Sequence, residues 1–190
     1  MKGITEIRWH GRAGQDTVSA AKILADTALA AGDCVQAFPE YGPEREGAPV
    51  RAYNRIGKRC FSIYCEIEHP GVVIVIDPTL LDTVNVTEGA TAETVFLVNS
   101  PKCVADLKAA HPQLKPYAVK TVDATNISLA VLGKNIPNTP TLGALAKCTG
   151  VIGVESLKEN VKEVLGKKLS AEVIAKNLTV VDRGFAEVQE

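Results

Sequence analysis

Hydrophobic residues recur along this chain with two different periods. Residues 4–9 alternate between apolar and polar side chains, as strands do, and in residues 17–31 apolar side chains recur at helical spacing, from Val18 to Leu29. Residues 72–76 and 95–98 are continuous apolar runs, typical of parallel strands covered on both faces. The pattern therefore predicts alternating strands and helices, which is the signature of an α/β fold.

The remaining elements follow from the same periods and from turn residues. We expect strands at residues 35–38, ended by Pro39, at 50–56 and at 118–122, and a hairpin partner at 60–64 across the turn at 57–58. We expect helices at residues 102–110, 126–132, 142–149, 157–165 and 170–188. Residues 1–190 should form a single α/β domain, a largely parallel sheet with helices on both faces and a helical C-terminal segment.

Composition and charge exclude several classes of partner. Hydrophobic residues make up 46% of the 190-residue chain and the formal net charge is -1, so no global field attracts nucleic acid or an anionic membrane. No run approaches the roughly 20 apolar residues of a membrane span. The chain enters a strand pattern directly, with no signal-peptide core, so we expect it to be cytoplasmic.

The cysteines point to the same compartment. There are five, an odd number, at positions 34, 60, 65, 103 and 148, and no C-x-x-C pair occurs. Cys60 and Cys65 lie near opposite ends of one expected strand, a poor geometry for a bridge or a shared metal. We interpret the cysteines as buried reduced thiols, and their spacing disfavours an iron–sulfur cluster carried by this chain.

A glycine turn between the first strand and the first helix is the strongest candidate binding feature. Residues 10–16 read His-Gly-Arg-Ala-Gly-Gln-Asp, and a helix N-terminus after such a turn favours anions. Ala13 and Asp16 stand where the dinucleotide fingerprint has glycines, which argues against an independent NAD- or flavin-dependent enzyme. The candidate contacts in this turn are Gly11, Arg12, Ala13, Gly14 and Gln15. The alternative is a tight turn packed against a partner.

Other polar segments are expected at the same edge of the sheet. Ligands of open α/β sheets bind beyond the carboxyl ends of the strands, where residues 10–15, 39–47, 77–78 and 99–100 should meet. Arg45 is a candidate anion contact, or else a surface ion-pair partner of Glu44 or Glu46. The three histidines form no metal set, and no catalytic constellation can be assembled. A cleft without catalytic residues suits a non-catalytic subunit.

Several ordered motifs resemble one family over nearly the whole chain. Residues 11–16 resemble the glycine signature G-x-G-G-Q-G, with Ala13 and Asp16 replacing glycines, and residues 39–50 resemble a second loop in which Glu46 replaces a common arginine. Residues 72–77 match a central strand ending in aspartate, residues 138–145 match N-x-x-x-L-G-A-L, and residues 177–184 match a last helix that ends in glycine. The family is the gamma subunit of 2-oxoacid:ferredoxin oxidoreductases.

This resemblance implies a division of labour among subunits. Thiamine diphosphate and iron–sulfur clusters would sit in alpha, beta and delta partner subunits, and this chain alone would bind none of them. The chain would help to bind coenzyme A as co-substrate. The enzyme would convert a 2-oxo acid to acyl-CoA and CO2 and reduce ferredoxin or another acceptor, and pyruvate is the favoured candidate for the 2-oxo acid. The isolated chain should be inactive. A stand-alone nucleotide-binding or regulatory module is the alternative.

Overall fold

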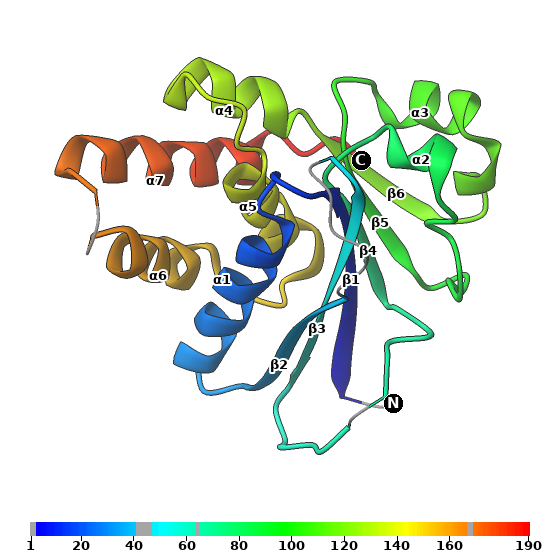
Figure 1. Ribbon diagram of the computed structural model, residues 1–190, viewed down its shortest axis with the longest axis horizontal. Helices are drawn as coiled ribbons and strands as arrows, with labels where there is room; N and C mark the ends of the chain where they lie inside the picture. The colour runs from blue at the N-terminus through cyan, green and yellow to red at the C-terminus, as the bar shows by residue number, and fades with distance from the viewer. Residues whose placement is uncertain (1–2, 41–46, 64, 167–168) are drawn as a thin grey trace.

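The computed structural model describes residues 3–40, 47–63, 65–166 and 169–190 (Figure 1). Its centre is a six-stranded sheet in the order β2-β3-β1-β4-β5-β6. The strands are β1 (Ile4–Arg12), β2 (Cys34–Glu40), β3 (Pro49–Gly57), β4 (Val72–Val75), β5 (Val95–Asn99) and β6 (Ala118–Val122). Strands β1, β4, β5 and β6 are parallel, whereas β3 runs antiparallel to both of its neighbours. The expected α/β fold with a largely parallel sheet is confirmed.

Helices cover both faces of the sheet, as expected. One face carries α1 (Thr17–Ala30), α4 (Ala124–Leu132), α5 (Asn138–Thr149), α6 (Val154–Gly166) and α7 (Ala171–Ala186), and the other carries α2 (Leu80–Thr83), α3 (Val104–Ala110) and the 3-10 turn η1 (Pro112–Leu114) (Figure 1). Four helices in succession after β6 form the expected helical C-terminal segment. In the described residues, no helix is long and apolar enough to cross a membrane.

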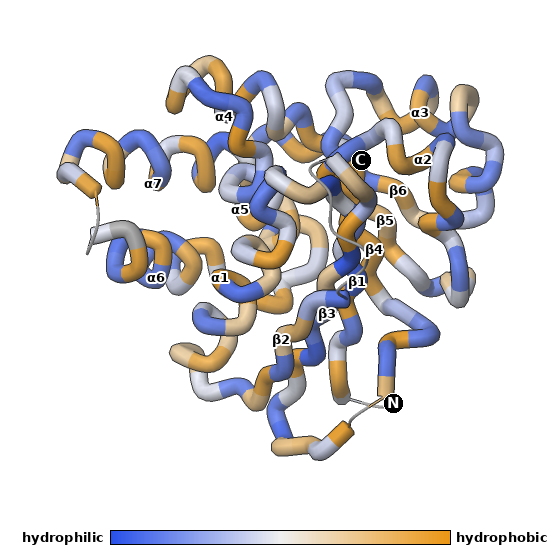
Figure 2. The backbone as a smooth tube through the Cα atoms, viewed as in Figure 1, coloured by the Kyte–Doolittle hydropathy of each residue, from blue (hydrophilic) through white to orange (hydrophobic). Residues whose placement is uncertain are grey.

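The apolar strands and amphipathic helices pack as their patterns predict. Every residue of β4 is buried, and its side chains divide between the core clusters on the two faces of the sheet. The helices α6 and α7 alternate hydrophobic and hydrophilic residues along their length (Figure 2), and their apolar sides join the larger cluster through Leu157, Val161, Val180 and Val181. Burial of these faces stabilises the helices more than their intrinsic propensity does.

The first strand and the first helix differ in detail from the prediction. Strand β1 continues through His10 to Arg12, because Gly11 and Arg12 pair with the start of β3, so the turn itself comprises only residues 13–16. Small side chains provide most of the buried face of α1, whereas Val18 and Leu29 are exposed. The prediction of those two residues on the buried face was wrong.

The antiparallel part of the sheet corrects two predicted elements. Pro39 does not end β2, which continues to Glu40, with Pro39 opposite Ala52. Because β2 is the edge strand, a residue without an N–H is tolerated there. The predicted strand at residues 60–64 was wrong: residues 60–63 form none, and residue 64 lies outside the described residues. Strand β3 already has β2 on one side and β1 on the other, so it has no free edge for a hairpin partner.

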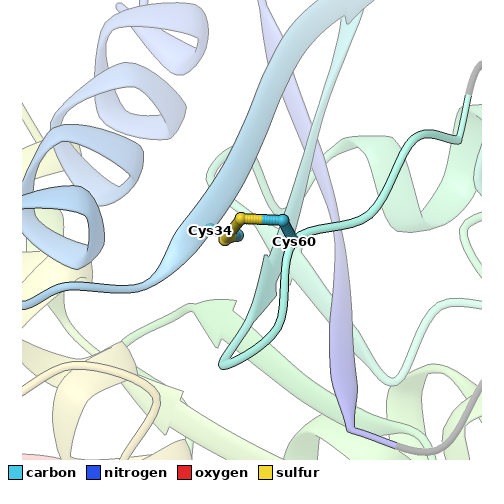
Figure 3. Close-up of a disulfide and its surroundings, with 2 residues drawn as sticks. All are labelled: Cys34 and Cys60. Carbon is cyan, nitrogen blue, oxygen red and sulfur yellow. A yellow bond between two sulfur atoms is a disulfide. The ribbon is translucent and has the colours of Figure 1, made fainter.

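The cysteines are not the buried thiols expected from the sequence. Cys34 and Cys60 form a disulfide with 5.1 Å between their Cα atoms (Figure 3). Their proximity follows from the register of β2 and β3, which places Cys34 opposite Gly57, three residues before Cys60. Of the free cysteines, Cys65 and Cys103 are exposed and Cys148 is half-buried.

Two glycines of the family motifs meet where α5 crosses α7. A Cβ on Gly143 would lie 2.2 Å from the carbonyl oxygen of Val181, and a Cβ on Gly184 would lie 2.0 Å from the carbonyl oxygen of Pro140. Both distances are far inside van der Waals contact, and the contacted atoms belong to the backbone. The two glycines therefore allow the helix backbones to approach each other directly.

Candidate functional site

The glycine turn lies at the edge of the sheet that the strand directions predict. Strands β1, β2, β4 and β5 run in the same direction, so their carboxyl ends meet at this edge. The end of the second loop lies beside the turn, because the Ala13 N–H donates to Ala48 O at 2.9 Å and the Gly47 N–H donates to Ala13 O at 3.2 Å. Arg45 lies outside the described residues, so its role stays a prediction.

Arg12 and Gln15 converge on Asp77, the residue that follows β4. The Arg12 Nε lies 3.2 Å from Asp77 Oδ2, and the amide nitrogen of Gln15 donates to the same oxygen at 2.7 Å. The Arg12 guanidinium also donates to Thr79 Oγ1 at 2.7 Å and to Gly47 O at 3.0 Å. This polar network ties three segments of the sheet edge together and holds the turn in one conformation.

The same network fixes the charge of Asp77. Burial opposes ionisation, but hydrogen bonds from Thr79 and Gln15, with the charge of Arg12, outweigh it and lower the pKa of the Asp77 carboxyl. Asp77 is therefore ionised at neutral pH and neutralises Arg12. A multiply charged phosphate at the base of the turn would meet this carboxylate, so the turn suits a neutral, hydrogen-bonding group better.

Gly11 near the end of β1 and Gly14 in the turn meet different steric requirements. A Cβ on Gly11 would lie 2.0 Å from Thr17 Oγ1, so Gly11 makes room for a side chain of α1. Gly14 adopts φ +95°, where L-residues are strained, with open space around the position of a Cβ. Asp16 has a left-handed conformation with φ 54°, which aspartate tolerates better than most residues. Asp16 thus occupies a conformation that glycine adopts readily.

The turn offers unused backbone donors. Among the described residues, the N–H groups of Gly14 and Asp16 have no hydrogen-bond acceptor, and the Asp16 side chain does not cap α1. Gly14 and Asp16 are both exposed residues. The positive end of the helix dipole is directed at the same place. This arrangement can bind the carbonyl oxygen of a ligand.

Residues 99–100, the last of the four segments expected at this edge, have a structural role. Asn99 is 3% exposed; its side-chain amide donates to Ile76 O at 2.9 Å and its oxygen accepts from Thr125 N at 3.2 Å. It therefore joins the end of β4 to the start of α4. Ser100 is also buried, and its hydroxyl accepts from Lys102 N. Residues 99–100 are therefore buried structural residues and not part of an accessible site.

A polar cluster on the other side of β1 was missed from the sequence. Arg8 and His10 of β1 lie on the same face as Arg51 and Tyr53 of β3, the face away from α1. Tyr53 donates to Glu40 at the end of β2, and Arg51 forms ion pairs with Glu40 at 3.7 Å and Glu88 at 3.5 Å. The signal was present, since polar residues alternate along both strands, but alternation usually marks a solvent-exposed face.

His10 is held as a neutral imidazole in this cluster. It is 1% exposed, and burial, followed by the charges of Arg8 and Arg51, lowers its pKa to about 3. Arg8 Nε donates to His10 Nε2 at 3.1 Å. Arg8 in turn is fixed by hydrogen bonds to Val86 O at 2.9 Å and Glu88 O at 2.6 Å. His10 is therefore no proton carrier near neutral pH. In the described part of the chain, no three metal-ligating side chains cluster.

The chain was compared with known families and proteins. Residues 6–187 match the family described as "Pyruvate ferredoxin/flavodoxin oxidoreductase". This chain belongs to that family. It is 45% identical over 184 residues to "Pyruvate synthase subunit PorC" of Thermotoga maritima, covering 97% of this chain and 94% of the relative. It is 47% identical over 167 residues to "Pyruvate/ketoisovalerate oxidoreductases common subunit gamma" of Thermococcus litoralis, covering 86% and 90%. The resemblance to gamma subunits of 2-oxoacid oxidoreductases is confirmed.

Solved structures of family members share the fold. The crystal structure of the Thermotoga maritima pyruvate oxidoreductase subunit PORC (EC 1.2.7.1) superposes with a TM-score of 0.85 at 41% identity, covering 99% of this chain and 98% of that one. A 2-oxoglutarate:ferredoxin oxidoreductase from Magnetococcus marinus, solved with coenzyme A and succinyl-CoA, has a TM-score of 0.76 at 21% identity. The match covers 98% of this chain but 31% of that one, so the same fold forms part of a larger chain there.

Proposed function

We propose that this chain is the gamma subunit of an oxidoreductase that converts a 2-oxo acid and coenzyme A to acyl-CoA and CO2 and reduces ferredoxin. Alpha, beta and delta partner subunits hold thiamine diphosphate and the iron–sulfur clusters. The observation that carries the proposal is the end-to-end likeness to subunits named for pyruvate synthase.

Pyruvate is the proposed 2-oxo acid, with its selection assigned to the partner subunits. A relative named as common to pyruvate and ketoisovalerate oxidoreductases serves enzymes with different substrates. A subunit shared in this way cannot by itself distinguish the two acids. The proposal therefore places the substrate contacts outside this chain.

Gly11, Arg12, Ala13, Gly14 and Gln15 are proposed to contact coenzyme A, with Arg45 from the second loop. Asp77 disfavours the pyrophosphate at the base of the turn, whereas the amides of Gly14 and Asp16, which have no acceptor among the described residues, suit the carbonyl oxygens of the pantetheine arm. Arg12 holds the turn in shape through Thr79 and Gly47. Its guanidinium acts as a positioning group in this proposal.

The subunit assignment is tested by purification of the native complex. We expect the chain to co-purify with larger subunits and the complex to oxidise a 2-oxo acid only when coenzyme A and an acceptor are present. The isolated chain should show no turnover. Purification as a single species without partners would favour the alternative, a stand-alone nucleotide-binding or regulatory module.

The coenzyme A contact is tested in the assembled enzyme with Arg12→Leu. Loss of the bonds to Thr79 and Gly47 should raise the apparent KM for coenzyme A about tenfold, equivalent to about 1.4 kcal/mol, and leave the KM for the 2-oxo acid unchanged. Lys22→Ala, an exposed change on α1, is the matched control. An assembled Arg12→Leu enzyme with normal coenzyme A dependence would leave the turn with a structural role only.

A further inference from the structure

A cavity of about 210 Å³ lies beside the candidate site, on the face of the sheet away from α1. It is lined by His10, Glu40, Pro49, Val50, Arg51 and Val84. These residues come from the ends of β1 and β2, the start of β3 and the segment after α2. Because a water molecule occupies about 30 Å³ in the liquid, the cavity can hold several waters or one small organic molecule.

His10 presents a hydrogen-bond donor to this cavity. Arginine has donors only, so the bond from Arg8 Nε requires a lone pair on His10 Nε2. A neutral imidazole carries a single proton, which must then be on Nδ1. Among the described residues, Nδ1 has no hydrogen-bond partner. The polar side-chain atoms that lack a hydrogen-bond partner and are fully enclosed are those of Thr17, Asp33 and Thr121, and His10 Nδ1 does not belong to this group. His10 is 1% exposed and lines the cavity, so an acceptor for this unused donor would be a ligand or a water molecule in that space.

Arg51 adds a positive charge in the same wall. Its guanidinium is 3.7 Å from Glu40 Oε2 and 3.5 Å from Glu88 Oε2. Both distances exceed the 2.7–2.9 Å of a strong charge-assisted hydrogen bond, so closer contacts to a ligand would strengthen its pairing. Glu40, engaged by the Tyr53 hydroxyl, keeps one negative charge at the cavity and disfavours a ligand with two. Pro49 and Val84 add apolar residues to the lining.

We propose that this cavity is a binding site for a small monocarboxylate of about two to four carbons, bound by His10 Nδ1–H and Arg51. One carboxylate oxygen accepts from the imidazole and the other from the guanidinium, while the short alkyl part contacts Pro49 and Val84. The site lies on the opposite face of β1 from α1 and uses none of the residues proposed for coenzyme A. It goes beyond the proposed function and does not depend on it.

The test uses the full-length chain with ¹⁵N-labelled histidine and acetate or pyruvate as the probe. The chain has three histidines, so each ring can be followed separately by NMR. We expect His10 to be the Nδ1–H tautomer at neutral pH, and its Nδ1 resonance to shift saturably with acetate. His69 and His111 are internal controls, and sodium chloride at equal ionic strength controls for screening. Acetamide, of similar size but uncharged, should bind at least tenfold more weakly.

Two variants separate the site from the fold. Arg51→Met should weaken acetate binding at least tenfold with the His10 tautomer retained, and His10→Phe should abolish binding while circular dichroism remains that of the native protein. Lys108→Met, near η1, should leave the affinity unchanged. An Nε2–H tautomer at His10, a shift equal in acetate and chloride, or unchanged affinity in Arg51→Met would each overturn the proposal. These results are independent of whether the subunit assignment holds.

Discussion

The sheet edge at residues 11–16 and the crossing of α5 and α7 both belong to glycine-bearing family motifs, but their glycines have different tasks. At the crossing, Gly143 and Gly184 allow backbone to touch backbone. At the sheet edge, Gly11 near the end of β1 accommodates the Thr17 side chain, and Gly14 in the turn provides a positive φ with open space around the position of a Cβ. The same residue type therefore marks packing in one region and chain direction in the other.

This difference predicts how each region responds to an added methyl group. Backbone atoms cannot move without shifting a whole helix, whereas a side chain can rotate and an exposed turn can relax. Substitution should thus cost most at the crossing and least at Gly14.

The largest effect is expected for Gly184→Ala. Its Cβ would lie 2.0 Å from Pro140 O, so α5 and α7 must separate. We expect a loss of about 3 kcal/mol in the free energy of unfolding, at the upper end of the range for overpacked cores, measured by urea denaturation. Gly143→Ala should behave similarly.

Gly133→Ala serves as the matched control for this comparison. Gly133 also follows a helix but has open space around the position of a Cβ, so only its φ of +67° opposes substitution. A loss for Gly184→Ala no greater than that for Gly133→Ala would contradict the assignment of Gly184 to close packing.

Strands were predicted correctly in both halves of the sheet, but the pairing in the antiparallel half could not be predicted from sequence. The continuous apolar run of β4 has one interpretation, a strand covered on both faces, and the structure confirms it. The apolar residues around position 62 have the same local pattern as a strand, but pairing depends on whether a neighbour has a free edge. Strand β3 has none, and this fact belongs to the whole sheet.

The candidate site was predictable to a similar extent. The strand–turn–helix order placed residues 11–15 at the carboxyl edge, and that position is confirmed. The partners of Arg12 were not predictable, because Asp77 and Thr79 lie more than sixty positions away in the chain. The cavity beside His10 was also missed, since it requires the register of β1 against β3 and the path of the segment after α2.

An intermediate effect is expected for Gly11→Ala. The new methyl group would meet Thr17 Oγ1, which must turn away within a buried site. We expect a loss of about 2 kcal/mol, within the usual range for an added core methyl. A double-mutant cycle with Thr17→Ser identifies the cause, because serine lacks the second γ substituent and can move its hydroxyl aside. Additive losses in that cycle would exclude Thr17 as the origin.

His10, next to the sheet edge, should also make the free energy of unfolding depend on pH, an effect that the glycines of the α5–α7 crossing do not have. Free histidine ionises near 6.5, but folded His10, facing Arg8, Arg51 and Glu40, stays neutral to about pH 3. Between these two pH values the unfolded chain binds one more proton than the folded chain. The contribution of His10 to the free energy of unfolding is therefore fully present above pH 6.5, and it falls by about 1.4 kcal/mol for each pH unit below that value. We expect about 1.4 kcal/mol less stability at pH 5.5 from this group, measured by denaturant unfolding.

His10→Gln isolates this contribution from that of the carboxylates. Glutamine retains an acceptor for Arg8 but does not titrate, so the pH profile of the variant should be flatter between pH 6.5 and 5. Parallel profiles for the variant and the natural chain would mean that His10 is protonated in the folded protein.

The smallest effect is expected for Gly14→Ala, and it separates conformation from contact most cleanly. At φ +95° alanine is strained, but no atom lies within 4 Å of the position of its Cβ. We expect a loss of about 1 kcal/mol, the lower end of the cost of a left-handed conformation for an L-residue. Gly14→Asn should cost less, since asparagine adopts this region more readily, although it is the larger side chain. A greater loss for asparagine than for alanine would show that the turn is limited by space, and the contrast with Gly184 would then disappear.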